Sequence, residues 1–128
     1  MGLDMYAHAT RHDVGSKQVD LDIPDGSEGH ELMYWRKFNR LHGWMEQLYF
    51  AKSGTVTDFN CCNLQLTAVD LDKLEAELDE EHMPTTEGFF FGGDEPLNDE
   101  HKESVREFLL AARTALDNGL VVYYSAWY

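Results

Sequence analysis

The chain has 128 residues, of which 43% are hydrophobic and 12% aromatic, and this composition predicts one folded domain, residues 1–128, rather than a disordered chain. Its formal net charge of −14 argues against direct nucleic-acid binding, because a nucleic-acid partner requires a basic surface. No apolar run approaches the ~20 residues of a membrane span, so we expect no membrane interaction.

Two segments near the N-terminus have the pattern of half-buried strands. Apolar and polar residues alternate in Gly2–Thr10 and again in Lys17–Ile23. The connection between them passes through Gly15, so the pattern predicts a hairpin with a fairly long loop. Pro24–Ser27 then predicts a turn.

The segment Gly29–Ala51 has the pattern of one long helix that ends at Ser53-Gly54. Its apolar residues recur at intervals of four and three, which places them on one side of a helix. This stripe consists of Tyr34, Phe38, Leu41, Met45 and Leu48.

Phe59–Leu66 has the composition of a strand, and a second helix, Ala68–Glu81, follows it. Thr67 and Asp70 have the spacing of a capping box, with Asp in place of the usual Glu. Met83–Leu97 contains two prolines and several glycines and predicts a loop or a short strand.

A third helix begins at Asn98 or Asp99, and Asp117-Asn118-Gly119 predicts its end through a left-handed residue. Leu120–Trp127 is rich in β-branched and aromatic residues and predicts a terminal strand. We therefore expect an α+β fold with the order β-β-α-β-α-α-β, a mostly antiparallel sheet of about four strands covered by three helices.

One flank of the first predicted helix carries an unusual group of polar and aromatic residues. At 100° per residue, four candidate ligand-binding residues lie along this flank: Glu31, Trp35, Asn39 and His42. Glu31 and His42 are roughly 16 Å apart along the axis, so any chemistry requires a group from another element. Candidates for that group are Tyr6, His8, Asn60 and Tyr124. Three interpretations remain open: a polar network that orients the helix, a small-molecule or metal-dependent site, and a protein-binding surface.

The second predicted helix presents a strongly negative surface. Its candidate partner-binding residues are Asp72, Glu75, Glu77, Asp79 and Glu80. Such a surface would favour association with a basic protein surface through electrostatic steering. The alternative is that the acidity serves only solubility.

The sequence indicates no catalytic residue, no cofactor and no metal site. His8 and His12 have the spacing that binds metal on a helix, but this segment has the pattern of a strand that enters a loop. No Ser-His-Asp or Cys-His nucleophile set is recognisable. Cys61 and Cys62 are adjacent, where a disulfide is strained, so we expect thiols in a reducing cytoplasm.

Five motifs carry a resemblance to a known family. They are Met1-Gly2-Leu3-Asp4-Met5-Tyr6, Glu31-Leu-x-Tyr34-Trp35-Arg36-Lys37-x-Asn39-x-Leu41-His42-x-Trp44, Phe59-Asn60-Cys61, Gly88-Phe89-Phe90-Phe91-Gly92 and Tyr123-Tyr124-Ser125-Ala126-Trp127. Together they resemble a family of small proteins common in bacteriophages and prophages, and the resemblance spans most of the chain. It implies a phage context and a location in the host-cell cytoplasm, and it carries over no catalytic role.

These features favour a phage-encoded, non-enzymatic accessory protein that binds a host protein. Its acidic surface would engage a basic surface of that partner. If this surface normally holds nucleic acid, the chain would act as an anti-defence protein of the anti-CRISPR type or as a host-takeover inhibitor. The alternative function is a small-molecule- or metal-binding protein or enzyme with its pocket on the flank that carries Glu31 and His42. The sequence does not indicate an oligomeric state.

Overall fold

The computed structural model describes residues 3–11, 13–15, 18–24, 26, 29–55, 62–80 and 99–127, without the side chains of Asn39 and Glu80. The elements are β1 (Asp4–Thr10), β2 (His30–Arg36), α1 (Asn39–Ala51), β3 (Leu64–Leu66), α2 (Ala68–Glu80), α3 (Asp99–Asp117) and β4 (Val121–Trp127). The predicted α+β fold and the order β-β-α-β-α-α-β are confirmed. The predicted loop Met83–Leu97 and the first residues of the predicted strand Phe59–Leu66 lie outside the described residues.

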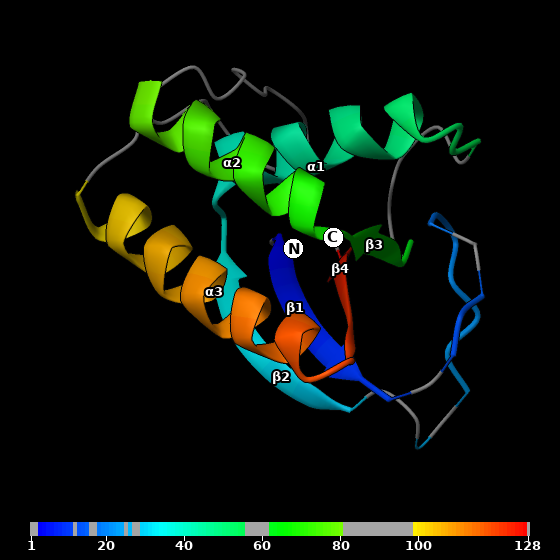
Figure 1. The fold of residues 1–128 in the computed structure, drawn as a ribbon. Coiled ribbons are helices and arrows are strands. Elements are labelled where there is room, and N and C mark those ends of the chain that lie inside the picture. Colours follow the sequence, from blue (N-terminus) through cyan, green and yellow to red (C-terminus); the bar gives the residue numbers. More distant parts are fainter. Residues whose placement is uncertain are drawn as a thin grey trace.

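The four strands form one antiparallel sheet in the order β2-β1-β4-β3. Apolar side chains from one face of the sheet form a single buried cluster with the inward sides of all three helices. On β1 this face, which we call the covered face, carries Met5 and Ala7. Because side chains alternate along a strand, Asp4, Tyr6 and His8 point to the opposite face, which we call the open face. Figure 1 shows α2 and α3 side by side in front of the strands.

The second strand is not the segment that the sequence predicted. The structure places β2 at His30–Arg36, inside the predicted helix Gly29–Ala51, and the helix α1 begins only at Asn39. Lys37 has a φ of 57°, a conformation that ends the strand before the helix starts. Tyr34, which the periodicity placed in the buried stripe, is consequently 44% exposed.

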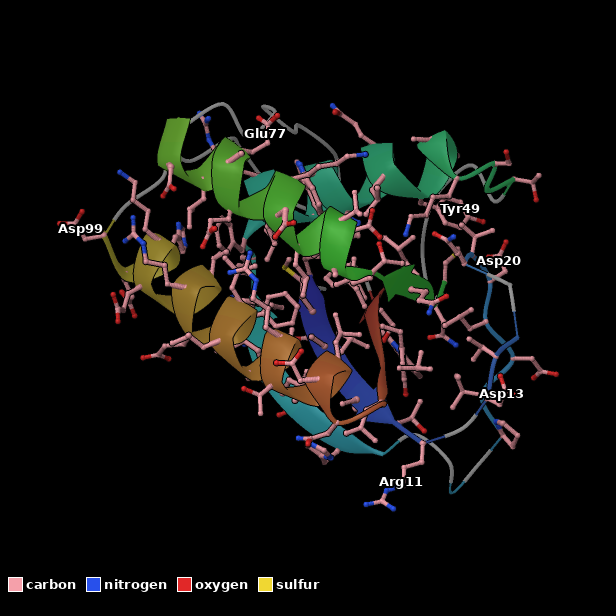
Figure 2. All side chains as sticks on the ribbon, viewed as in Figure 1. Arg11, Asp13, Asp20, Tyr49, Glu77 and Asp99 are labelled. Atoms are coloured by element: carbon pink, nitrogen blue, oxygen red, sulfur yellow. The ribbon has the colours of Figure 1, made fainter. Side chains whose placement is uncertain are left out.

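The predicted hairpin between Gly2–Thr10 and Lys17–Ile23 is also wrong, because β1 pairs with β2 and β4 instead. Within the second segment, Val19 forms an isolated bridge to Leu64 at the edge of β3. Asp20 has a φ of 51°, which interrupts the extended conformation that a longer strand requires. Tyr49 on α1 donates a hydrogen bond to the Asp20 carboxylate, 2.9 Å to each oxygen, and the two residues lie together in Figure 2.

Local signals at the start of α2 and at the end of α3 were predicted correctly, whereas the start of α1 was not. The capping box at the start of α2 is present: the Asp70 carboxylate accepts a hydrogen bond from the Thr67 N–H at 2.9 Å, and Thr67 Oγ1 accepts one from the Asp70 N–H at 3.3 Å. Gly119 follows α3 with a φ of 79°, the left-handed end that the sequence predicted. Cys62 is buried, and Cys61 lies outside the described residues.

Among the described residues, no helix has the length and hydrophobicity that crossing a membrane requires.

Candidate functional site

The structure does not bring the predicted ligand-binding residues together. Trp35 is buried on the covered face, where its ring lies edge-on to Phe108 and its indole N–H donates a hydrogen bond to Ser104 Oγ at 3.1 Å. His42 lies on the buried side of α1, whereas Glu31 lines a pocket on the open face. Asn39 is the first residue of α1, and its side chain lies outside the described set. A common pocket of Glu31, Trp35 and His42 is therefore not formed.

His42 belongs to a polar pair inside the core. Its Nδ1 lies 2.7 Å from the hydroxyl of Tyr124 on β4, and the side chains of both residues are inaccessible to solvent. Burial lowers the pKa of His42 to about 4, so the imidazole is neutral at neutral pH. The pair fixes α1 over the centre of the sheet, which matches the first of the three interpretations, a polar network that orients the helix.

An irregularity in β2 turns Glu31 toward the open face. Ala7 on β1 pairs with Met33, but the next residue, His8, pairs with Glu31, so Leu32 is an extra residue in the ladder. Such a bulge changes which face the following side chains point to. Glu31 consequently stands beside His8 on the open face, while Leu32 packs against the buried cluster.

The open face contains a pocket of about 400 Å³. The described residues that line it are Tyr6, His8, Ile23, Glu31, Asn63, Tyr123, Ser125 and Trp127. The alternation of β4 explains its shape, because the small Ser125 lies between two aromatic residues, Tyr123 and Trp127, on the same face. Ser125 pairs with Tyr6 across the strands, and both residues line the pocket.

Aromatic rings form a continuous series across the open face. Tyr34 and Tyr6 have ring centroids 5.2 Å apart, Tyr6 and His8 are 6.2 Å apart, and His8 and Tyr123 are 5.3 Å apart. Trp127 stands at the end of β4 with 62% of its surface exposed. Tyr6 and His8 are half-buried and Tyr123 is buried, so Trp127 and Tyr34 present the most exposed aromatic surface to a ligand.

A small polar network lies at one border of the open face. The Tyr34 hydroxyl donates a hydrogen bond to Asp4 Oδ1 at 2.6 Å, and Arg36 Nε lies 3.8 Å from the same oxygen. The hydrogen bond to Asp4 raises the pKa of Tyr34 above its usual value. The Asp4 charge is thus engaged locally, whereas Glu31 forms no ion pair with any described residue.

The predicted acidic surface lies on α2, and arginines of α3 contact part of it. Asp72 and Glu75 accept hydrogen bonds from Arg113 at 2.9 and 3.1 Å, and Asp79 lies 3.7 Å from Arg106. The bond to Glu75, followed by the one to Asp72, raises the pKa of the Arg113 guanidinium. All three carboxylates nevertheless remain exposed.

The other two predicted acids of this surface are Glu77 and Glu80, and the structure describes only the side chain of Glu77. Glu77 is half-buried and lines a shallow hollow between α1 and α2, and it lies at the outer side of α2 in Figure 2. The side chain of Glu80 lies outside the described set.

Within the described ranges, no three histidine, cysteine or carboxylate side chains are grouped so that they could hold a metal ion.

No family model matches the chain, and no curated protein or solved structure is significantly similar to it. The described structure offers two candidate sites, the acidic surface of α2 and the pocket on the open face.

Sequence reasoning found one residue of the open-face pocket, Glu31, and named Tyr6 and His8 only as possible neighbours. It missed Ser125 and Trp127 as site residues. Their signal was available, because alternation along the correctly predicted strand Leu120–Trp127 places Tyr123, Ser125 and Trp127 on one face. The sequence did not show which face of the sheet the helices cover, so it did not show that Tyr123, Ser125 and Trp127 lie on the open face.

Proposed function

We propose that this chain is a phage-encoded accessory protein that binds a host protein through a basic surface of that partner. The observation that carries the proposal is the charge of α2, which has six acidic residues and one basic residue within 13 positions. Asp72, Glu75 and Asp79 are exposed on it. A negative helix of this kind attracts a basic surface over distances comparable to the Debye length, about 8 Å at physiological salt.

The contacts to α3 keep two of these carboxylates at the surface between the two helices. Arg113 bridges Asp72 and Glu75, and both carboxylates remain accessible to a partner. Arginine also offsets part of the negative charge, which means that the partner must supply several basic groups to compete. Exposed ion pairs contribute only about 0–1 kcal/mol each, so such competition is feasible.

In its finer form, the proposal is that the host partner normally binds nucleic acid and that this chain occupies the same basic surface in the host cytoplasm. A row of carboxylates presents negative charge to the lysines and arginines that would otherwise contact phosphates. The chain would then act as an inhibitor of a host nucleic-acid-binding protein, such as a defence protein. The resemblance to small phage proteins and the net charge of −14 both support this interpretation.

The experiment is affinity capture from bacterial host lysate at increasing NaCl concentration, with matched charge variants. The double variant Asp72→Asn/Asp79→Asn removes two exposed charges from α2. The control Asp13→Asn/Asp22→Asn removes two exposed charges elsewhere and leaves the same net charge. We expect the unmodified chain and the control to capture the same host protein up to the same NaCl concentration, and the α2 variant to lose it at a lower NaCl concentration. Added nucleic acid should displace that protein from the unmodified chain. A partner that both variants retain equally would contradict the proposal.

A further inference from the structure

We propose that the pocket on the open face binds the guanidinium group of an arginine side chain presented by a partner protein. This inference goes beyond the proposed function, because the pocket and the acidic surface of α2 lie on opposite sides of the sheet. Two independent features carry it. One is a carboxylate that pairs with no basic side chain of the described residues, and the other is a set of aromatic rings around it.

The carboxylate is Glu31, which the bulge in β2 turns into the pocket. Among the described residues no basic side chain forms an ion pair with it, and Arg36, at the other end of β2, pairs with Asp4. A carboxylate that accepts two parallel hydrogen bonds matches the planar fork of an arginine. Bulges commonly re-aim side chains at functional positions, which fits a binding role for Glu31.

The aromatic component consists of Tyr6, His8, Tyr123 and Trp127, all of which line the same pocket. A guanidinium group stacks on such rings through cation–π attraction and through contact of flat surfaces. The hollow above Ser125 leaves room for an inserted side chain, and its volume of about 400 Å³ lies in the lower part of the range of small-ligand pockets. Tyr123 and Ser125 are buried and form the base of the pocket, whereas Glu31 and Trp127 are exposed and can contact an inserted side chain.

Charge complementarity selects the occupant. A chain with a net charge of −14 repels anionic ligands and a second copy of itself, and it attracts a cationic segment. Arginine fits better than lysine, because a compact ammonium group is strongly hydrated and cannot stack its plane on the rings. A neutral flat ligand would contact the rings without pairing with the Glu31 carboxylate. The uncharged citrulline peptide in the experiment below tests for that case.

The test is an NMR titration of the ¹⁵N-labelled full chain with three capped peptides: acetyl-Gly-Arg-Gly-amide, its citrulline analogue and its lysine analogue. Citrulline keeps the shape of arginine and removes the charge. We expect saturable shifts at Glu31, His8 and the Trp127 indole N–H, with a dissociation constant roughly fivefold lower for arginine than for either analogue. Equal affinity for citrulline or lysine, or shifts elsewhere only, would overturn the proposal.

Variants locate the site and separate it from the proposed function. Glu31→Gln should weaken arginine-peptide binding roughly fivefold, and Trp127→Ala should weaken it by a similar factor. Glu107→Gln on α3, which changes the net charge equally, should leave the titration unchanged. The double variant Asp72→Asn/Asp79→Asn should also leave it unchanged while it reduces capture of the host protein. Loss of peptide binding in that double variant would show that a general charge effect, not this pocket, causes the binding.

Discussion

The two faces of one sheet differ in what their side chains do. Tyr124 and Tyr123 are consecutive residues of β4, and both are buried. Tyr124 points to the covered face, where its hydroxyl contacts His42 inside the core. Tyr123 points to the open face, where its ring stacks on His8 and lines a pocket.

This difference teaches that burial alone does not identify a structural residue. On the covered face, polar groups such as His42 and the Trp35 indole have partners within the chain. On the open face, Glu31 and Trp127 are exposed and direct polar and aromatic surface outward. Substitutions on the covered face should therefore change stability, whereas substitutions of the exposed open-face residues Glu31 and Trp127 should change binding with little effect on stability.

The largest expected change in stability distinguishes a tryptophan of the covered face from one of the open face. Trp35→Ala removes a ring that is only 5% exposed and its bond to Ser104, so the free energy of unfolding should fall by about 3 to 5 kcal/mol. Trp127→Ala removes a ring that is 62% exposed and should cost about 0.5 kcal/mol or less. Urea unfolding followed by circular dichroism measures both. Similar losses for the two variants would show that the two faces are not energetically distinct.

The same contrast between buried and exposed groups occurs within α2. Asp70 is buried, caps the helix and forms an ion pair with Lys52, whose ammonium group also donates to the Gln65 carbonyl at 2.7 Å. Asp70→Asn leaves a buried ammonium without its counter-charge and should reduce stability by about 3 kcal/mol. The matched variant Asp72→Asn breaks an exposed ion pair and should cost less than about 1 kcal/mol. Chemical denaturation of both variants at pH 7 checks this ratio, and a small loss for Asp70→Asn would contradict it.

The sequence predicted the fold class, the element order and most element ends because these depend on local signals. The capping box at Thr67 and the left-handed end at Gly119 are examples, since a few adjacent residues determine each one. The strand β2 was missed because its bulge at Leu32 breaks the alternation: four consecutive apolar residues, 32–35, fit a helix as well as a strand. Only pairing with β1, which is a long-range contact, decides between the two.

The candidate site depended on that error. Placing Glu31 and Trp35 on a helix put them on one flank with His42, whereas the strand directs Glu31 to the open face and Trp35 to the core. The glycine before β2 shows the same long-range control. Gly29 has a φ of 78°, and a Cβ there would lie 1.8 Å from the Ala9 carbonyl oxygen, a contact that no local pattern reveals.

The pH dependence of stability should reveal the buried His42. Its pKa is lowered to about 4 in the folded chain, against 6.5 when unfolded. Below pH 6.5 the unfolded chain binds a proton that the folded chain does not, so stability is complete above pH 6.5 and falls as the pH decreases toward 4. The expected loss from this residue is about 2 kcal/mol at pH 5. NMR of the imidazole should show no titration above pH 5, and a midpoint near 6.5 would contradict the buried pair.

Two hydroxyl deletions give the smallest effects and the sharpest comparison of the faces. Tyr124→Phe removes the partner of a buried imidazole and should reduce the free energy of unfolding by about 1 to 2 kcal/mol.

Tyr34→Phe removes an exposed hydrogen bond to Asp4, where water replaces the lost partner, and should leave the urea midpoint at pH 7 unchanged. The two chains should differ only at alkaline pH. The pKa of Tyr34 is raised in the folded chain because its neutral hydroxyl donates to Asp4, so the wild-type chain loses stability as the pH rises above 10, whereas the Phe variant has no phenol to ionise there and keeps its stability. Ultraviolet titration of phenolate absorbance in the two chains measures that shift, and a Tyr34 that ionises at its ordinary pKa would show that the open-face bond does not persist in solution.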